Sequence, residues 1–325
     1  MNDATKHILA HFLMAAACLI FGTSTVAMLY QLEPFYSGYY SFAWWSYIIF
    51  IESFLYCRGS KSLLFENPRE FLLLVPFSTT LWLVFESLNF RLSNWHYINI
   101  PSDTAVRWTG YFVAYSTVLP GIFSTKDLIE HFGVLKNSKT APVSNPPKLY
   151  KPFILTGIFF LILPLVWPGY FFPLVWGAFI FLLEPVNHWA GASSLLREWE
   201  KGSLRNFYLL FFSGVVCGLL WELWNFRAGS KWIYTVPHFA FLKVFEMPLL
   251  GFFGFPPFAV ECYAMTAGFF LLISSIGKKY PPPRALCLYA ALAAGMVLFD
   301  VLVFAGIDRL TVISFQDFAP FGARP

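Results

Sequence analysis

Long apolar runs recur along the whole sequence, and they constrain the fold more than any other feature. The hydrocarbon core of a bilayer is about 30 Å thick, so a helix needs roughly 17 to 25 apolar residues to cross it. Runs of this kind occupy residues 8–30, 38–57, 70–90, 106–124, 152–167, 170–188, 206–225, 257–277 and 285–306. The sequence therefore predicts an all-α, polytopic integral membrane helix bundle with about nine transmembrane helices.

Composition supports this prediction. Hydrophobic residues make up 58% of the 325 residues and charged residues only 12%, whereas soluble domains carry roughly 25% charged residues. Aromatic residues make up 21%, more than the aromatic belts at the two membrane interfaces require, so part of them must face the interior. The five cysteines stand singly in apolar runs without a C-x-x-C. That pattern favours small buried apolar side chains over a disulfide framework or a zinc site.

Basic residues predict the orientation. Most of the 22 lysine and arginine residues lie in alternate loops, on the side of the bundle that holds the N-terminus. Cytoplasmic loops of membrane proteins are enriched in basic residues. We therefore expect the N-terminus in the cytoplasm and the C-terminus on the outer side. The apolar run that begins at Ile8 is longer than the apolar region of a signal peptide, and we interpret it as the first spanning helix.

One motif occurs twice. Residues 86–101 and 222–237 both read E-x-x-N-F-R, then W-x-Y, then Pro. The two halves of the chain also share an earlier glutamate followed by a Ser-Leu-Leu element. In the first half these are residues 52 and 62–64, and in the second half they are residues 184 and 194–196. This predicts two parallel four-helix repeats plus one extra C-terminal helix, related as parallel repeats are by an axis along the membrane normal. The expected units are residues 1–130, a cytoplasmic linker at 131–151, residues 152–280, and residues 281–325 with the ninth helix and an outer tail.

Acidic residues inside spanning helices are rare, because one at a helix centre costs about 2.5 to 3.5 kcal/mol on insertion scales. Glu86 and Glu222 lie near the outer ends of two predicted spans, and each is followed three residues later by an asparagine, Asn89 or Asn225. This spacing places the carboxyl and the amide on one face of the helix. We predict a catalytic group in which Glu222 is the acid and the other three side chains are its partners.

Two interpretations of these glutamates remain open. In the first, Arg91 and Arg227, each five residues after a glutamate, neutralise the carboxyls, and each glutamate caps a helix end. In the second, the related helices bring the acids together at the bundle axis for chemistry. Further polar and aromatic side chains gather in the same outer loop, which favours the second interpretation. For Glu52 and Glu184, near the basic inner loops, a structural role is favoured.

The candidate substrate-binding residues are aromatic or charged side chains of the outer segments and of the helix at 257–277. They are Trp95, Tyr97, Trp232, Tyr234, Arg91, Arg227, Lys231, Glu246 and Glu261. The stretch 245–257 is apolar but rich in Gly and Pro. Irregular backbone at membrane depth must be buried in protein or line a cavity. We predict a re-entrant or interfacial segment that walls an outer-facing pocket, and the alternative is a Pro-kinked start to the next helix.

The sequence identifies no cofactor. It contains no Walker, C-x-x-C, H-E-x-x-H or G-x-G-x-x-G element, so the templates of soluble enzymes do not apply, and no metal site is predicted. Two glutamates and two asparagines could supply oxygen ligands to Mg²⁺. With the nearby arginines they could hold a diphosphate, and this remains a secondary alternative.

These features predict a membrane enzyme that acts on an apolar lipid, an isoprenoid above all, in an outer-facing aromatic pocket. A carboxylic acid kept neutral among aromatic side chains can act as a general acid, and aromatic faces stabilise the carbocation formed when an alkene is protonated. Cyclase, hydratase or isomerase chemistry is expected. The alternatives are a proton-coupled transporter or lipid flippase, and a structural or quinone- or pigment-binding subunit of a membrane complex. The expected partners are membrane lipids, an apolar small molecule and another membrane protein, but no nucleic acid.

Overall fold

A computed structural model describes residues 2–238 and 241–317, and the chain is mostly helical, at 74%. Seven helical segments in this part are long and apolar enough to cross a membrane. They are α1 (Asp3–Leu29), α4 (Pro68–Leu92), α7 (Pro147–Val166), the segment Pro168–Trp189, α11 (Arg205–Arg227), the segment Leu249–Lys279 and α13 (Pro282–Leu310). The all-α integral membrane architecture expected from the sequence is therefore confirmed at this level.

The remaining elements are shorter. Segment Pro168–Trp189 consists of α8 (Pro168–Phe171), the 3₁₀ helix η1 (Phe172–Gly177) and α9 (Ala178–Trp189), and segment Leu249–Lys279 consists of η2 (Leu249–Gly254) and α12 (Phe255–Lys279). The other helices are α2 (Tyr39–Cys57), α3 (Leu63–Glu66), α5 (Thr104–Tyr115), α6 (Val118–His131) and α10 (Leu195–Glu200). The described residues also form six short strands, namely β1 (Trp95–Ile98), β2 (Ile100–Pro101), β3 (Lys231–Tyr234), β4 (Lys243–Val244), β5 (Met247–Pro248) and β6 (Phe315–Gln316).

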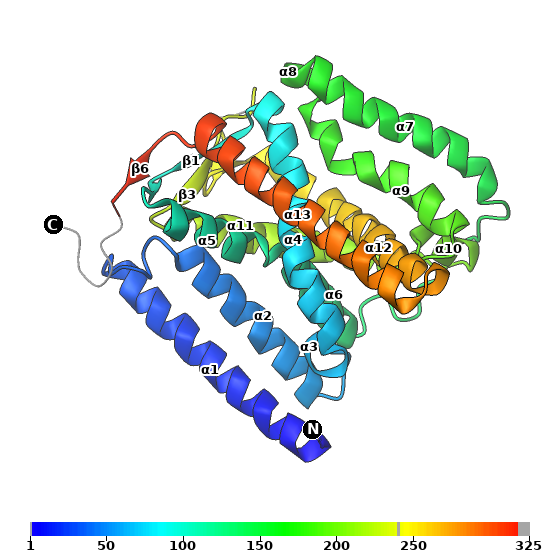
Figure 1. The fold of residues 1–325 in the computed structure, drawn as a ribbon, viewed down its shortest axis with the longest axis horizontal. Helices are drawn as coiled ribbons and strands as arrows, with labels where there is room; N and C mark the ends of the chain where they lie inside the picture. The colour runs from blue at the N-terminus through cyan, green and yellow to red at the C-terminus, as the bar shows by residue number, and fades with distance from the viewer. Residues whose placement is uncertain (1, 239–240, 318–325) are drawn as a thin grey trace.

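The bundle has two distinct ends (Figure 1). Strands β1, β3 and β6 gather at one end, where α1, α4 and α13 finish, and the N-terminus, α3, α10 and the turn between α12 and α13 lie at the other. The site predicted from the duplicated motif belongs to the strand-bearing end. We call it the strand end below.

Two of the nine predicted spans are not among the seven. Residues 38–57 form the single helix α2, whose tyrosine, tryptophan and serine side chains lower its hydropathy. The span predicted at 106–124 is instead divided into α5 and α6 at Ser116 and Thr117, whose hydroxyls donate to the carbonyls of Val113 (3.0 Å) and Ala114 (2.6 Å). Such local side-chain bonds compete with helix continuation.

Ser78 of α4 satisfies the backbone at this division. Its hydroxyl donates to the Tyr115 carbonyl (2.7 Å) and accepts from the Leu119 amide (3.0 Å). A buried backbone group without a hydrogen-bond partner costs free energy. The Ser78 hydroxyl avoids this cost for two backbone groups at the break between α5 and α6. As a result, α5 ends beside the strands rather than continuing as one long span.

The two inner glutamates make matching contacts. Glu52 Oε2 accepts from the Ser62 hydroxyl (2.7 Å) and the Leu64 amide (3.1 Å), and Glu184 Oε2 accepts from Ser194 (2.7 Å) and Leu196 (3.1 Å) in the same way. The two serines are also the N-caps of α3 and α10. Both carboxyls therefore hold a short helix in place, which agrees with the structural role favoured from the sequence.

The interior is aromatic, as the composition indicated. The fully buried Trp44 indole packs against the indoles of Trp221 (ring centroids 5.6 Å apart) and Trp224 (4.8 Å). Gly121 of α6 allows this packing, because a Cβ atom there would lie 2.7 Å from the Trp44 ring. Elements α2, α6 and α11 therefore meet in one tightly packed core below the strands.

Candidate functional site

The two copies of the motif meet as a two-stranded antiparallel ribbon. β1 pairs with β3 so that Trp95 stands opposite Tyr234 and Tyr97 stands opposite Trp232. Side chains that are directly opposite, or two residues apart on one strand, share a face of a β-ribbon. All four aromatic side chains therefore lie on the same face, which brings together the four aromatic residues predicted to bind substrate.

That face borders a cavity of about 710 Å³, within the range of about 300–1,000 Å³ typical of small-molecule sites. Residues of α1, α2, α4, α5, α6, η1, α11 and α12 also line it, and the lining is predominantly apolar. Met247, Gly251 and Gly254 also line it. The stretch predicted to wall a pocket does contribute to one, through β5 and η2 followed directly by α12.

Packed aromatic rings form and support one part of the wall. Trp176 of η1 stacks on Phe85 (centroids 5.4 Å apart) and Trp95 (6.0 Å), and it meets Phe258 of α12 edge to face (5.5 Å). Trp82 lies 5.8 Å from Trp95. Aromatic faces attract positive charge by about 0.5 to 2 kcal/mol each, so this wall suits an apolar ligand or a cationic intermediate.

Glu86 lies behind this wall and not on the cavity surface. It is fully buried, and its Oε1 accepts from Trp82 Nε1 (2.8 Å), Trp95 Nε1 (3.0 Å) and the Tyr97 hydroxyl. Its Oε2 has no hydrogen-bond partner among the described residues. One carboxyl of α4 thus holds three aromatic side chains of the cavity wall.

Glu222 of α11 has the corresponding position in the second copy. It is also fully buried, and its Oε1 accepts from the Tyr234 hydroxyl (2.7 Å), while its Oε2 lacks a partner in the part of the chain that the structure describes. The Tyr234 hydroxyl accepts in turn from Trp232 Nε1 (2.9 Å). Each glutamate therefore contacts the cavity through a tyrosine of its own copy.

The arginines of the motif do not neutralise these carboxyls. Arg91 is exposed and donates to the Leu165 carbonyl (3.0 Å), while Arg227 is exposed beside the Phe226 ring. Within residues 2–238 and 241–317, neither Glu86 nor Glu222 forms an ion pair. A buried carboxyl without a cation is costly to maintain in its charged form, and such groups in membrane proteins mark functional sites.

The two tyrosines keep their protons. Burial, and then the charge of Glu86, raise the pKa of Tyr97 well above its usual value, and burial followed by Glu222 does the same to the pKa of Tyr234. The Tyr115 hydroxyl donates to the Tyr97 hydroxyl (3.0 Å) and so extends the first chain of hydrogen bonds. Tyr97, Tyr115 and Tyr234 all line the cavity, so each carboxyl is connected to it by hydroxyl groups.

Asn89 and Asn225 have a different environment from the one predicted. Asn89 accepts from the Asn94 amide (2.8 Å) and donates to the Trp95 carbonyl (2.9 Å). Asn225 bonds both the amide and the carbonyl of Trp232 (2.9 Å each). The asparagines fasten the strands to the helix ends, and no hydrogen bond joins either one to a glutamate in the described part of the chain.

Replacing Asn225 by Ala should therefore weaken the fold of the site rather than its chemistry. The buried Trp232 amide and carbonyl would lose their partners, at a cost of about 1–3 kcal/mol. Thermal unfolding of the purified variant in detergent measures this loss. Asn137, whose side chain is exposed, provides the matched control. An Asn225→Ala variant with unchanged stability but no activity would show that the amide acts in the chemistry.

The other predicted substrate-binding residues are only partly at the cavity. Lys231 lines it and forms an ion pair with Glu246 (2.6 Å). Glu261 is fully buried in α12, does not line the cavity, and accepts from the Phe179 amide (2.6 Å) at the start of α9. A carboxyl is favourable at a helix N-terminus, so Glu261 fixes the break between η1 and α9 that places Trp176 in the wall.

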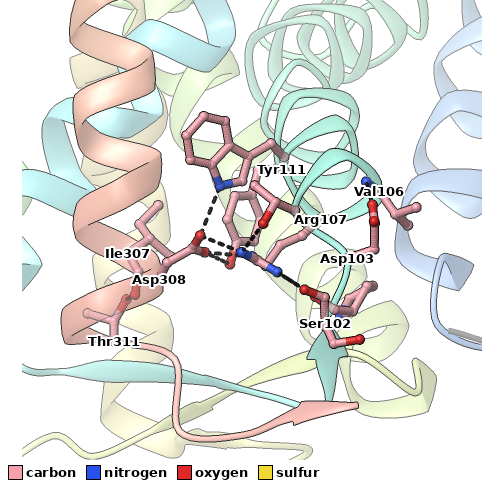
Figure 2. Close-up of polar contacts among 11 residues, drawn as sticks. Ser102, Asp103, Val106, Arg107, Tyr111, Ile307, Asp308 and Thr311 are labelled. Carbon is pink, nitrogen blue, oxygen red and sulfur yellow. Dashed lines mark hydrogen bonds and ion pairs between the residues drawn. The ribbon is translucent and has the colours of Figure 1, made fainter. Parts of the chain in front are cut away.

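A second polar cluster was missed by sequence reasoning (Figure 2). The Arg107 guanidinium of α5 bonds both oxygens of Asp308 of α13 (2.9 and 2.8 Å) and donates to the carbonyls of Pro101 and Ser102. Trp108 donates to the same aspartate. The available signal was a pair of opposite charges near the outer ends of two apolar runs, and this cluster holds α13 against α5 beside the cavity.

No group of three or more His, Cys, Asp or Glu side chains within residues 2–238 and 241–317 could hold a metal ion. The amide oxygens of Asn89 and Asn225 are occupied by backbone amides. The two asparagines of the oxygen set considered for Mg²⁺ are therefore committed to holding the strands.

No protein-family model, curated protein or solved structure significantly matches this chain. The fold and the site alone define its class. It is an integral membrane helix bundle that encloses an aromatic cavity at its strand end.

Proposed function

We propose that this protein is an integral membrane enzyme that acts on an apolar lipid, of the isoprenoid class, by acid-initiated chemistry of the cyclase, hydratase or isomerase type. The observation that carries the proposal is the aromatic cavity bordered by Tyr97 and Tyr234, each bonded to a buried glutamate without a cation. A predominantly apolar lining excludes water and favours hydrocarbon.

The chemistry uses only groups at the site. The neutral glutamic acid is the proton source: its proton passes to the tyrosine hydroxyl as that hydroxyl gives its own proton to one carbon of an alkene, whose π electron pair becomes the new C–H bond, so no tyrosinate forms. The carbocation left on the other carbon is stabilised by the indole faces. It then loses a proton to the carboxylate, adds water with loss of a proton, or closes a ring on a second alkene and loses a proton. The acid is regenerated in each case.

The two alternatives have less support. A transporter needs acids along a path between the two faces, but Glu52 and Glu184 do not line the cavity and instead hold α3 and α10. A quinone- or pigment-binding subunit would use the same aromatic wall. It would have no use for two carboxyls buried behind hydroxyl groups, and it would bind its ligand without turnover.

Finer features of the fold belong to the same proposal. We propose two parallel four-helix repeats, nine spans in all, with α13 outside the symmetry. The matched contacts of Glu52 and Glu184 and the pairing of β1 with β3 support the duplication. The basic loops support an N-terminus in the cytoplasm and a strand end on the outer side.

Mass spectrometry of co-purifying lipids tests the proposal. The protein purified in mild detergent should retain a defined isoprenoid that is absent from an unrelated membrane protein purified from the same cells. Bulk phospholipid alone in both preparations would contradict the proposed substrate class.

A further inference from the structure

The charged side chains that line the cavity are both neutralised. They are Arg107 and Lys231. Arg107 forms a bidentate ion pair with Asp308. Its other terminal nitrogen donates to the carbonyls of Pro101 (2.9 Å) and Ser102 (2.7 Å). Lys231 lies 2.6 Å from Glu246. A phosphate or carboxylate ligand would have to displace one of these partly buried partners, so among the described residues the lining offers no free cation to an anionic headgroup.

The lining extends far along α1. Leu13, Ala16 and Ile20 line the cavity, and their spacing of three and four residues places them on one face of the helix. These positions lie 10 to 17 residues past the start of α1 at Asp3, roughly 15 to 26 Å along its axis. They therefore lie in the middle of a spanning helix, at the depth of the hydrocarbon core.

The opposite rim belongs to α5. Val106, Gly110 and Val113 line the cavity there, again on one helical face. Ile20 on α1 is 45% exposed and Val106 on α5 is 39% exposed, and Gly110 is exposed as well. Figure 1 shows α1 at the edge of the bundle, beside α2. Lining residues on both rims thus reach the apolar outer surface.

We propose that the ligand is an uncharged, long-chain lipid that enters the cavity sideways from the bilayer between α1 and α5. This inference rests on the proposed function and narrows its substrate class, because it favours a free isoprenoid alcohol or hydrocarbon over an isoprenoid diphosphate. The neutralised charges decide the headgroup, and the two exposed apolar rims, of which the α1 rim lies at hydrocarbon depth, decide the route.

Gly110 allows a direct test of the route. A Cβ atom at this position would meet nothing within 4 Å, so a larger side chain can leave the backbone here without a clash, and we expect an indole to narrow the opening. Gly295 on α13 is likewise exposed with nothing within 4 Å, and it does not line the cavity. Gly110→Trp and Gly295→Trp are therefore the same change at a rim position and at a matched control position.

The experiment measures loading of radiolabelled geranylgeraniol, and separately of geranylgeranyl diphosphate, into the full-length protein in lipid nanodiscs. Wild type and Gly295→Trp should load the alcohol at the same rate, and Gly110→Trp should load it at least about tenfold more slowly. The diphosphate should not compete with the alcohol at equal concentration.

The outcomes separate the two proposals. Unchanged loading by Gly110→Trp would overturn the lateral route, and tighter binding of the diphosphate would overturn the uncharged headgroup, while both results would leave an apolar-lipid enzyme in place. Failure of the wild type to bind either probe, together with the absence of a co-purifying isoprenoid, would count against the proposed function itself and with it this inference.

Discussion

Replacing Glu222 by Gln is expected to lower turnover by about 10²- to 10⁴-fold, the range by which a positioned general acid accelerates a reaction. The amide oxygen can still accept from the Tyr234 hydroxyl, which now lies 2.7 Å from Oε1, so the cavity wall should stay in place. The amide cannot supply the proton that restores Tyr234. The rate of conversion of the co-purified lipid measures the effect.

Two further variants show which carboxyl and which hydroxyl take part in the reaction. Glu86→Gln removes the corresponding acid of the first copy and shows which of the two carboxyls does the chemistry. Tyr234→Phe removes only the hydroxyl between Glu222 and the cavity, so it should reproduce the loss seen for Glu222→Gln. If Glu222→Gln turns over normally, or if it fails to fold while Tyr234→Phe remains active, Glu222 has only a structural role.

Replacing Asp308 by Ala should produce the largest loss of stability among the substitutions considered. The Arg107 side chain is only 8% exposed and that of Asp308 17%, so the variant leaves a buried guanidinium without its partner, at a cost of about 3–5 kcal/mol. Trp108 and Tyr111 also lose the acceptor of their hydrogen bonds. A large downward shift of the thermal unfolding midpoint in detergent measures this loss.

Two controls test this prediction. One removes both charges of the Arg107–Asp308 ion pair, and the other removes an acid from an exposed ion pair. Removing both charges in Arg107→Met with Asp308→Leu should recover part of the stability, because an uncharged pair no longer has a desolvation cost. Asp3, whose side chain is 84% exposed in its pair with His7, should tolerate replacement by Asn with little change. Equal effects at Asp308 and Asp3 would contradict the anchoring role assigned to this cluster.

The sequence predicts the architecture well because apolar length is a local property. In the described part of the chain, runs of apolar residues give seven of the nine expected spans. The run at 38–57 forms one helix of lower hydropathy. The division at 106–124 depends on Ser116 and Thr117, which bond their own preceding turn, and on Ser78 from a different helix. The tertiary partner that stabilises the interruption cannot be recognised from the run itself.

The site was predictable only in part. The duplicated motif identified Glu86, Glu222 and the four aromatic residues of β1 and β3, because buried acids in apolar runs stand out. The asparagines were predicted to take part in catalysis, but their side-chain amides bond the strand backbone. The i, i+3 spacing is the same for a catalytic and for a structural asparagine, so it could not distinguish the two roles. Trp176 and Asp308 lie far along the chain from the motif residues that they support, so no spacing rule relates them.

Deuterium incorporation tests the central claim most directly. An apolar lipid extract from the native membranes is incubated with the purified protein in D₂O, and the products are analysed by mass spectrometry. Because Tyr234 and Glu222 exchange their protons with solvent, acid-initiated chemistry should place one solvent deuterium on carbon in the product of the wild type and none with Glu222→Gln. Product formed without carbon-bound deuterium, or labelled equally by the variant, would contradict the account.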